Sequence, residues 1–222
     1  MKTSRIGIVI AGGVGSRLGP GPPKGLRPFA GSTLFQRARD LLATRCERVI
    51  AAVPHDFPLS PSSGCERVDD LAYMAGPLAG LVPALEQAAL MRADVAWVIP
   101  VDLPFLEGQH LDALVYALDP PDGPNTPLSV VPPAAVLPRT RRGIEPLVGA
   151  YRPVYAAPLL RSSWNRGERA PQHALSDFGG RIRYLDAEDE AVWPGGLASL
   201  VGTNTPDEWE RAEERIRGNA AR

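Results

Sequence analysis

Apolar runs alternate with amphipathic stretches along the first half of the chain, and this alternation predicts its secondary structure. Four short runs predict β-strands at residues 6–11, 48–53, 65–68 and 95–101. Between them, apolar residues spaced three or four positions apart predict helices at 33–43, from Pro77 to residue 89, and at 111–118. Pro77 suits a first helical turn, where its missing N–H costs nothing.

The second half of the chain is less regular in its pattern. Strands are predicted at 128–131 and 147–151, with a polar basic loop between them that contains Arg139, Arg141 and Arg142. Helices are predicted at 154–162 and 171–178, followed by a strand at 181–185. A final amphipathic helix is predicted at 206–217, with Thr205 as its N-cap.

Strands that alternate with helices are typical of a mostly parallel sheet covered on both faces. The predicted fold class is therefore α/β, as a single Rossmann-like three-layer α/β/α domain over residues 1–222. In such sheets ligands bind beyond the carboxyl ends of the strands. The segment after the first strand and Asp102 after the 95–101 strand both lie at such ends, so we expect them to face one crevice.

Composition narrows the class of protein. The 222 residues carry 24 basic and 25 acidic side chains, a net charge of −1, so no broad surface for nucleic acid or an acidic membrane is expected. No apolar run approaches the roughly 20 residues that span a bilayer, and the start shows no signal-peptide pattern. Cys46 and Cys65 form no disulfide framework and are expected to be reduced thiols. A cytoplasmic location is expected.

The loop after the first strand carries the chemistry of a phosphate-binding segment. It contains four glycines, Arg17, and then Lys24 after a proline-bearing stretch. Glycines let backbone N–H groups approach an oxyanion, and the two cations can neutralise a polyphosphate. The loop is not a P-loop, because Gly25 follows Lys24, and it lacks the third glycine of a dinucleotide fingerprint. The alternative is an ordinary strand–helix turn with two surface cations.

Acidic residues at the same predicted edge can hold a metal ion. Asp102 ends a buried strand and can bind Mg²⁺, which bridges phosphates, although a role as a helix N-cap remains open. Asp69 and Asp70 precede the Gly76–Gly80 segment at the start of a helix. One of them can contact a ribose or the metal, or both can belong to a solvated loop. Asn204 can contact a second substrate or form a turn.

The histidine, serine and cysteine residues of the sequence are consistent with phosphoryl transfer. The three histidines are scattered, and no serine or cysteine lies in a nucleophile motif. Transfer of a phosphoryl or nucleotidyl group needs positioning and charge neutralisation, with no covalent nucleophile from the protein.

Motifs along nearly the whole chain resemble the molybdenum cofactor guanylyltransferases, within the nucleotidyltransferases of GT-A fold. They run IAGG from Ile10, SRLG from Ser16, KGL from Lys24, GPLAG from Gly76, DLPF from Asp102, EPL from Glu145, YR from Tyr151, GER from Gly167 and NTP from Asn204.

The resemblance implies transfer of GMP from MgGTP to the terminal phosphate of molybdopterin cofactor, with release of pyrophosphate. It also implies contact with the proteins that mature molybdoenzymes. Asp102 is implied as the Mg²⁺ ligand, Asn204 as part of the pterin side, and Arg17, Lys24 and Asp102 as the catalytic set. The nucleotide-binding residues that it implies are Ile10, Ala11, Gly12, Gly13, Lys24, Asp69 and Asp102.

Two departures from the family pattern leave other substrates open. One more residue separates Arg17 from Lys24 than is usual, and Ala52 stands where the family often has an asparagine. The alternatives are a CTP:molybdopterin cytidylyltransferase, a sugar-phosphate nucleotidyltransferase or a non-catalytic nucleotide-binding homologue. A dinucleotide-dependent reductase ranks last.

Overall fold

A computed structural model of the chain describes residues 3–12, 15–119 and 132–220. The strands are β1 Arg5–Ile10, β2 Pro28–Phe29, β3 Ser32–Thr33, β4 Arg48–Val53, β5 Glu66–Asp69, β6 Val95–Pro100, β7 Ala135–Thr140, β8 Gly143–Ile144, β9 Gly149–Tyr151 and β10 Ile182–Asp186. The α-helices are α1 Leu34–Ala43, α2 Leu78–Leu90, α3 Gly108–Leu118, α4 Pro153–Asn165, α5 Pro171–Ala174 and α6 Pro206–Ala220. Short 3₁₀ turns include η1 Ser16–Leu18 and η2 Lys24–Leu26.

The central sheet is mixed and mostly parallel, in the order β10-β7-β9-β6-β1-β4-β5, with β8 paired to β7. Strands β1, β4, β5 and β6 are mutually parallel along their ladders, and β9 runs antiparallel to β6 and β7. From β1 the chain moves to β4 and β5 on one side and then returns to β6 on the other. The order of strands therefore reverses beside β1, which is where ligands bind in α/β sheets.

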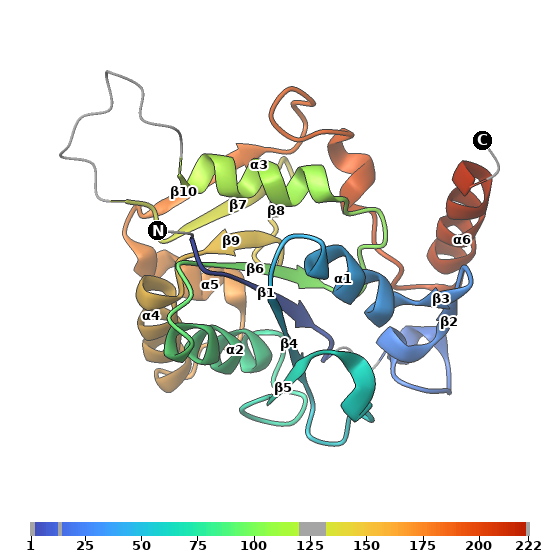
Figure 1. Ribbon diagram of the computed structural model, residues 1–222, viewed down its shortest axis with the longest axis horizontal. Helices are drawn as coiled ribbons and strands as arrows, with labels where there is room; N and C mark the ends of the chain where they lie inside the picture. Colours follow the sequence, from blue (N-terminus) through green and yellow to red (C-terminus); the bar gives the residue numbers. More distant parts are fainter. Residues whose placement is uncertain (1–2, 13–14, 120–131, 221–222) are drawn as a thin grey trace.

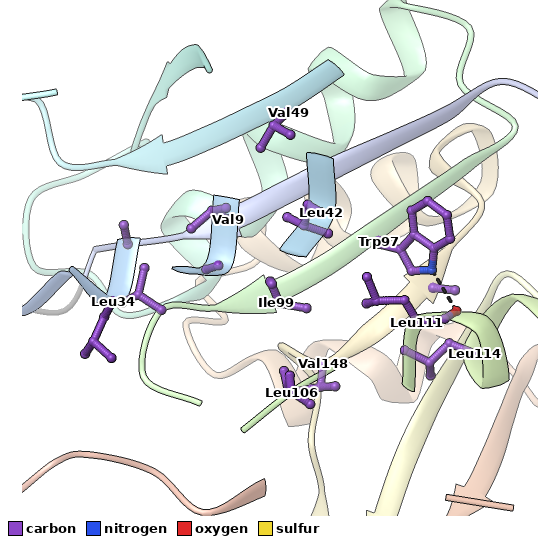
Figure 2. Packing of buried hydrophobic residues seen from close by; sticks show 14 of the residues in the cluster. Val9, Leu34, Leu42, Val49, Trp97, Ile99, Leu106, Leu111, Leu114 and Val148 are labelled. Carbon is purple, nitrogen blue, oxygen red and sulfur yellow. Dashed lines mark hydrogen bonds between the residues drawn. The ribbon is translucent and has the colours of Figure 1, made fainter. Parts of the chain in front are cut away.

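Helices cover both faces of the sheet, with α1 and α3 on one side and α2 and α4 on the other (Figure 1). Alternate residues of β6 supply the two cores: Trp97 and Ile99 pack toward α1 and α3, and Val98 packs toward α2 and α4. The fully buried Trp97 donates from Nε1 to the carbonyl oxygen of Leu111 at 2.9 Å (Figure 2). This bond satisfies the indole inside the core.

The elements predicted for the first half are confirmed, with boundaries that move by a few residues. Helix α3 begins three residues earlier than expected, because the N–H of Glu107 donates to Nδ1 of His110 at 2.8 Å and stabilises an added turn. In the part of the chain that the structure describes, no helix combines the length and the apolar character needed to cross a membrane.

In the second half of the chain, several predicted strands and loops differ from those in the structure. The strand predicted at 128–131 lies outside the described residues, and the predicted basic loop begins as a strand. Arg139 belongs to β7, while Arg141 and Arg142 form the turn between β7 and β8. The 147–151 strand is real but shorter, as β9. The later predictions are confirmed as α4, as α5 with a following 3₁₀ turn, as β10, and as α6 with Thr205 at its N-terminus.

Candidate functional site

The loop after β1 is held in shape by Arg27, a residue that the sequence analysis did not select. Its guanidinium donates from Nη1 to the carbonyl oxygen of Leu18 at 2.7 Å, from Nη2 to that of Gly19 at 2.6 Å, and from Nε to that of Pro22 at 3.0 Å. One planar guanidinium therefore binds three carbonyl oxygens and fixes the conformation of the loop. No local pattern distinguishes this arginine from the many others in the chain.

Gly15 allows the same loop to pack closely on Lys24. Its φ of +63° is a conformation that glycine adopts readily, and a Cβ at this position would lie 2.9 Å from Cβ of Lys24. The glycine at position 13, expected at the nucleotide, lies outside the described residues. Gly15 therefore has a structural reason in this loop, which is to bring the backbone against the base of Lys24.

Lys24 and Asp102 meet in space, as their positions at strand ends predict. The Nζ atom of Lys24 lies 3.1 Å from Oδ2 of Asp102 and donates to Oδ1 of Asn204 at 2.8 Å. The Lys24 side chain is 5% exposed and that of Asp102 28% exposed, so this ion pair is largely shielded from water yet open on the Asp102 side. Burial lowers the pKa of Lys24, although the negative charge of Asp102 acts in the opposite direction.

Asp70 lies beneath the loop between two glycines. A Cβ at Gly12 would come within 2.9 Å of Oδ2 of Asp70, and a Cβ at Gly80 within 2.7 Å of Oδ1. Oδ1 is buried and has no hydrogen-bond partner among the described residues. Burial, followed by the charge of Asp69, raises the pKa of Asp70 to about 6. A half-buried carboxylate with an unused acceptor is prepared for donors from a ligand.

Asp69, expected to contact the nucleotide, points elsewhere. Its carboxylate accepts from Nε of Arg67 at 2.7 Å and lies 3.3 Å from Nδ1 of His55, both on the exposed side of β5. Successive residues at a strand end point to opposite sides, so only one of the adjacent acids can face the crevice. Of the two, Asp70 is the residue that lines the crevice, whereas Asp69 pairs with Arg67 on the other side.

Two residues that were expected to contact the nucleotide, Ile10 and Ala11, each use one backbone group within the sheet. The N–H of Ala11 donates to the carbonyl oxygen of Ala52 at 2.9 Å, and the carbonyl oxygen of Ile10 accepts from the N–H of Val101 at 3.1 Å. These two groups continue the hydrogen bonding of the sheet, and the nucleotide contacts expected of Ile10 and Ala11 stay predictions. Ala11 is buried in the core, whereas Ile10 also borders a cavity.

A cavity of about 360 Å³ joins these residues at the point where the strand order reverses. Of the residues selected from the sequence, Ile10, Gly12, Arg17, Lys24, Asp102 and Asn204 line it. Further lining residues are Gly15, Asp70, Met74, Ala75, Gly76, Pro77, Gly80, Pro100, Val101 and Leu147. Because Gly76 and Pro77 precede α2, the positive end of that helix also borders the cavity. Cations, glycines and a helix terminus on one cavity suit an anionic, nucleotide-sized ligand.

The carboxylates fit a divalent cation that takes part of its ligand set from a substrate. Burial and then the negative charge of Asp102 raise the pKa of Glu145. No cluster of three or more metal-binding side chains exists within residues 3–12, 15–119 and 132–220. Mg²⁺ commonly binds one or two carboxylates together with phosphates and water, and a cation at Asp102 would offset the repulsion.

Comparison with known proteins identifies relatives across the whole chain. A family model described as MobA-like NTP transferase domain matches residues 7–178. The probable molybdenum cofactor guanylyltransferase of Natronomonas pharaonis is 28% identical, over 96% of this chain and 98% of the relative. The molybdenum cofactor guanylyltransferase of Pseudomonas syringae pv. syringae is 29% identical, over 90% and 88% respectively.

Solved structures share the fold. Molybdopterin-guanine dinucleotide biosynthesis protein A from Archaeoglobus fulgidus superposes with a TM-score of 0.71 at 22% identity, covering 96% of this chain and 99% of its own. The 2-C-methyl-D-erythritol 4-phosphate cytidylyltransferase from Thermus thermophilus reaches 0.68 at 14% identity, over 98% and 100%. At such identities the likeness establishes the architecture, and the activity must be argued from the site.

Proposed function

The chain belongs to the MobA-like NTP transferase domain family, and from this premise we propose that it transfers GMP from GTP to molybdopterin cofactor and releases pyrophosphate. The observation that carries the proposal is the meeting of Lys24 and Asp102 on one cavity beside the glycine-bearing loop. The choice of GTP and of the acceptor is supported by the names of the relatives in Natronomonas and Pseudomonas.

The reaction exchanges one phosphoanhydride bond for another. An oxygen of the acceptor's terminal phosphate attacks the α-phosphorus of GTP, and the bond from that phosphorus to the β-phosphate oxygen breaks. Lys24 and Arg17 line the cavity where the triphosphate would lie, and their charges offset the negative charge that builds on the departing pyrophosphate. No side chain needs to become covalently attached to the nucleotide.

Nucleotidyltransferases generally use a divalent metal ion, and we propose Mg²⁺ held by Asp102 for this chain. When bound, the ion supplies positive charge to the phosphate oxygens. Lys24 holds one carboxylate oxygen of Asp102, which fixes the direction in which the carboxylate faces the cavity. The negative charge of Asp102 also acts on Glu145, so a second acidic group favours a cation here.

We assign Asp70 the nucleotide contact first expected of Asp69. Guanine presents two adjacent donors, its N1–H and its 2-amino group, and a carboxylate can accept from both. Asp70 lines the cavity, and Gly12 and Gly80 leave room for its carboxylate because neither carries a side chain, which supports such a pairing. Ala52, fully buried next to Gly80, offers no competing polar group. Asp70 thereby supplies a means of reading the base in a chain without the family's asparagine.

Replacing Asp70 with asparagine is expected to weaken GTP binding about tenfold or more while stabilising the free protein at pH 8. The pKa of about 6 in the folded protein lies above the ordinary aspartate value of 3.8, so the stabilisation that protonated Asp70 provides is complete below pH 3.8 and is lost as pH rises through 6. At pH 8 the ionised group therefore destabilises the fold by roughly 1 kcal/mol after allowance for solvent screening. Thermal melts at pH 4.5 and 8 and calorimetric GTP titrations test both effects.

The same carboxylate predicts a pH dependence of binding. Ionised Asp70 accepts two hydrogen bonds from guanine, so GTP affinity should fall more steeply as pH drops through about 6 in the wild type than in Asp70→Asn. An unchanged melting temperature at pH 8 together with unchanged GTP affinity would remove Asp70 from the site.

The function itself is tested by measuring pyrophosphate release with each of the four NTPs. Reactions contain Mg²⁺ and either molybdopterin cofactor or a panel of sugar 1-phosphates, and mass spectrometry identifies the product. We expect the guanine dinucleotide of the cofactor, with GTP preferred over CTP by about 10² or more. Preference for CTP would replace the proposal with a cytidylyltransferase, and a sugar nucleotide product would replace the acceptor. Binding of GTP without turnover in any reaction would indicate a non-catalytic homologue.

We further propose that the reaction takes place in the cytoplasm and that the product passes to proteins that mature molybdoenzymes. The support is chemical: GTP is a cytoplasmic substrate, and the completed cofactor must reach an apoenzyme. Co-purification of the tagged chain with molybdoenzyme maturation proteins, compared with a variant that cannot bind GTP, tests this step.

A further inference from the structure

The segment after residue 178, where the family match ends, reaches back into the site. Thr203 is fully buried and donates to the carbonyl oxygen of Asp102 twice, from its N–H at 3.1 Å and from Oγ1 at 3.3 Å. The next residue, Asn204, accepts from Nζ of Lys24 at 2.8 Å. Two consecutive residues of one turn therefore contact Asp102 and Lys24.

Glu208, in the first turn of α6, holds this turn in place. Its Oε2 accepts from the backbone N–H of Asn204 at 2.7 Å and from that of Thr205 at 3.1 Å. In return, Oγ1 of Thr205 accepts from the N–H of Glu208 at 3.3 Å, which completes a capping box. An ordinary capping box binds the N-cap residue alone. Here the carboxylate also binds the residue before it, the one whose side chain contacts Lys24.

Gly202 shows how closely the turn is fitted. A Cβ at Gly202 would lie 2.8 Å from Nδ2 of Asn204, so the amide of Asn204 occupies the space that a side chain at Gly202 would take. With one face against Gly202 and its backbone held by Glu208, the amide has its Oδ1 directed at the ammonium of Lys24.

Helix α6 has other attachments that do not involve Glu208. The ring of Trp209 packs edge-on against Phe29 with centroids 5.1 Å apart, and Oε1 of Glu213 accepts from the N–H of Ala30 at 2.7 Å. These contacts tie the helix to the β2–β3 hairpin, and Figure 1 shows α6 beside that hairpin. Loss of the Glu208 carboxylate should therefore loosen the turn without detaching the helix.

We propose that Glu208 is a positioning residue of this site: through the backbone of Asn204 it holds the amide that orients the ammonium of Lys24 toward the triphosphate. The inference rests on the proposed function for its kinetic consequence, since only a nucleotide-using enzyme needs Lys24 oriented in this way. A displacement of about 1 Å in such a group can cost about 10² in rate. Glu208 itself touches neither the substrate nor the reacting atoms.

The test compares two variants that damage the same capping box on opposite sides. Glu208→Ala removes the acceptor for both Asn204 and Thr205, whereas Thr205→Ala removes only the acceptor for Glu208. Each should lower the melting temperature to a similar extent, because each removes one side of the cap. We expect kcat/KM for GTP to fall 10- to 100-fold in Glu208→Ala and less than threefold in Thr205→Ala. Glu208→Gln, which keeps an acceptor oxygen, should recover most of the activity.

Dependence on Asn204 gives a second criterion. If Glu208 acts through Asn204, the double variant Asn204→Ala/Glu208→Ala should be no slower than Asn204→Ala alone. Equal losses in Glu208→Ala and Thr205→Ala, or additive losses in the double variant, would show that Glu208 is only a helix cap.

A readout without turnover separates this inference from the proposed function. Amide exchange at Asn204 should quicken in Glu208→Ala and stay slow in Thr205→Ala, because only the first loses the bond at 2.7 Å. Lys2 and Lys24 are the only lysines in the sequence, so acylation at fixed pH in a Lys2→Met background, read by mass spectrometry on the peptide that contains Lys24 and not on the N-terminal amine, reports on Lys24. We expect faster acylation in Glu208→Ala. If the wild-type protein transfers no GMP but Glu208→Ala still shows both changes, the proposed function is overturned and the inference stands. If Glu208→Ala shows neither change, the inference is overturned.

Discussion

Asp102→Asn is expected to lower kcat/KM for GMP transfer by about 10³ or more with the fold retained. Asparagine has nearly the same shape and keeps an acceptor for Lys24, but it lacks the negative charge that a divalent cation requires. The backbone of Asp102 is also held by Thr203, so the side chain at this position should stay where it is. The loss therefore reports on charge at the site and not on misplacement.

The measurement is pyrophosphate release with GTP, molybdopterin cofactor and a Mg²⁺ series, together with thermal melting. Asp112→Asn is the matched control, since Asp112 lies on α3, pairs with Arg45 at 3.2 Å and is 60% exposed. It should retain wild-type kinetics. If Asp102→Asn kept activity within tenfold of wild type and the same Mg²⁺ dependence, the assignment of Asp102 as the metal ligand would be wrong.

The sequence could place the loop after β1 and Asp102 at the same edge of the sheet, whereas the contact between Lys24 and Asp102 also depends on how Arg27 and Gly15 fix that loop. Both residues come after apolar strands, and parallel strands bring their carboxyl ends to one edge whatever the details of packing. The 78 positions that separate them thus become 3.1 Å between a nitrogen and an oxygen. The roles of the two side chains in catalysis stay predictions.

The choice between Asp69 and Asp70 could not be made in this way. It depends on where β5 ends, and a shift of one residue exchanges the two faces. The strand ends at Asp69, whose side chain pairs with Arg67 on the exposed side, and Asp70 turns inward. The family motif led to Asp69, the residue that points outward, because a position in a motif carries no information on the direction of a side chain.

Strand β7 was predicted as a loop because of its basic residues, and Pro138 is also unusual in a central strand. On one side β7 pairs with β9 through Ala135 and Val136, and with β8 from Arg139 onward. Pro138 lies in the gap between the two partners, where its carbonyl oxygen accepts from the N–H of Glu145 at 3.0 Å and its missing N–H leaves no ladder bond unmade. This is a property of three segments together, which no window of local sequence contains.

The contacts of Arg27, Thr203 and Glu208 are similarly invisible in the sequence. Each acts through the backbone of another segment: Arg27 on three loop carbonyls, Thr203 on Asp102, and Glu208 on Asn204. A sequence pattern identifies residues whose chemistry suits a substrate. Residues that hold those side chains in place are identified only once the chain has folded.

Lys24→Met should lower kcat/KM for GTP by about 10² to 10³. The loss should lie mainly in KM if Lys24 binds the triphosphate of the ground state. It should lie mainly in kcat if Lys24 acts on the departing pyrophosphate. Methionine matches the length of the side chain and removes its charge. It leaves Oδ2 of Asp102 and Oδ1 of Asn204 without the donor that they share, so a lower melting temperature is also expected. Steady-state kinetics over a range of GTP concentrations and thermal melts measure the two effects.

Lys24→Arg should recover less than tenfold of that loss. The ammonium of Lys24 is 5% exposed, enclosed by Asp102 and Asn204, and its stem lies against the loop at Gly15. A guanidinium is larger and planar, and it cannot enter such a space without moving the loop. Lys2→Met removes the other lysine of the chain and should behave as wild type. Full activity in Lys24→Arg would mean that the site needs only a positive charge there, and it would contradict a geometry fitted to a single ammonium group.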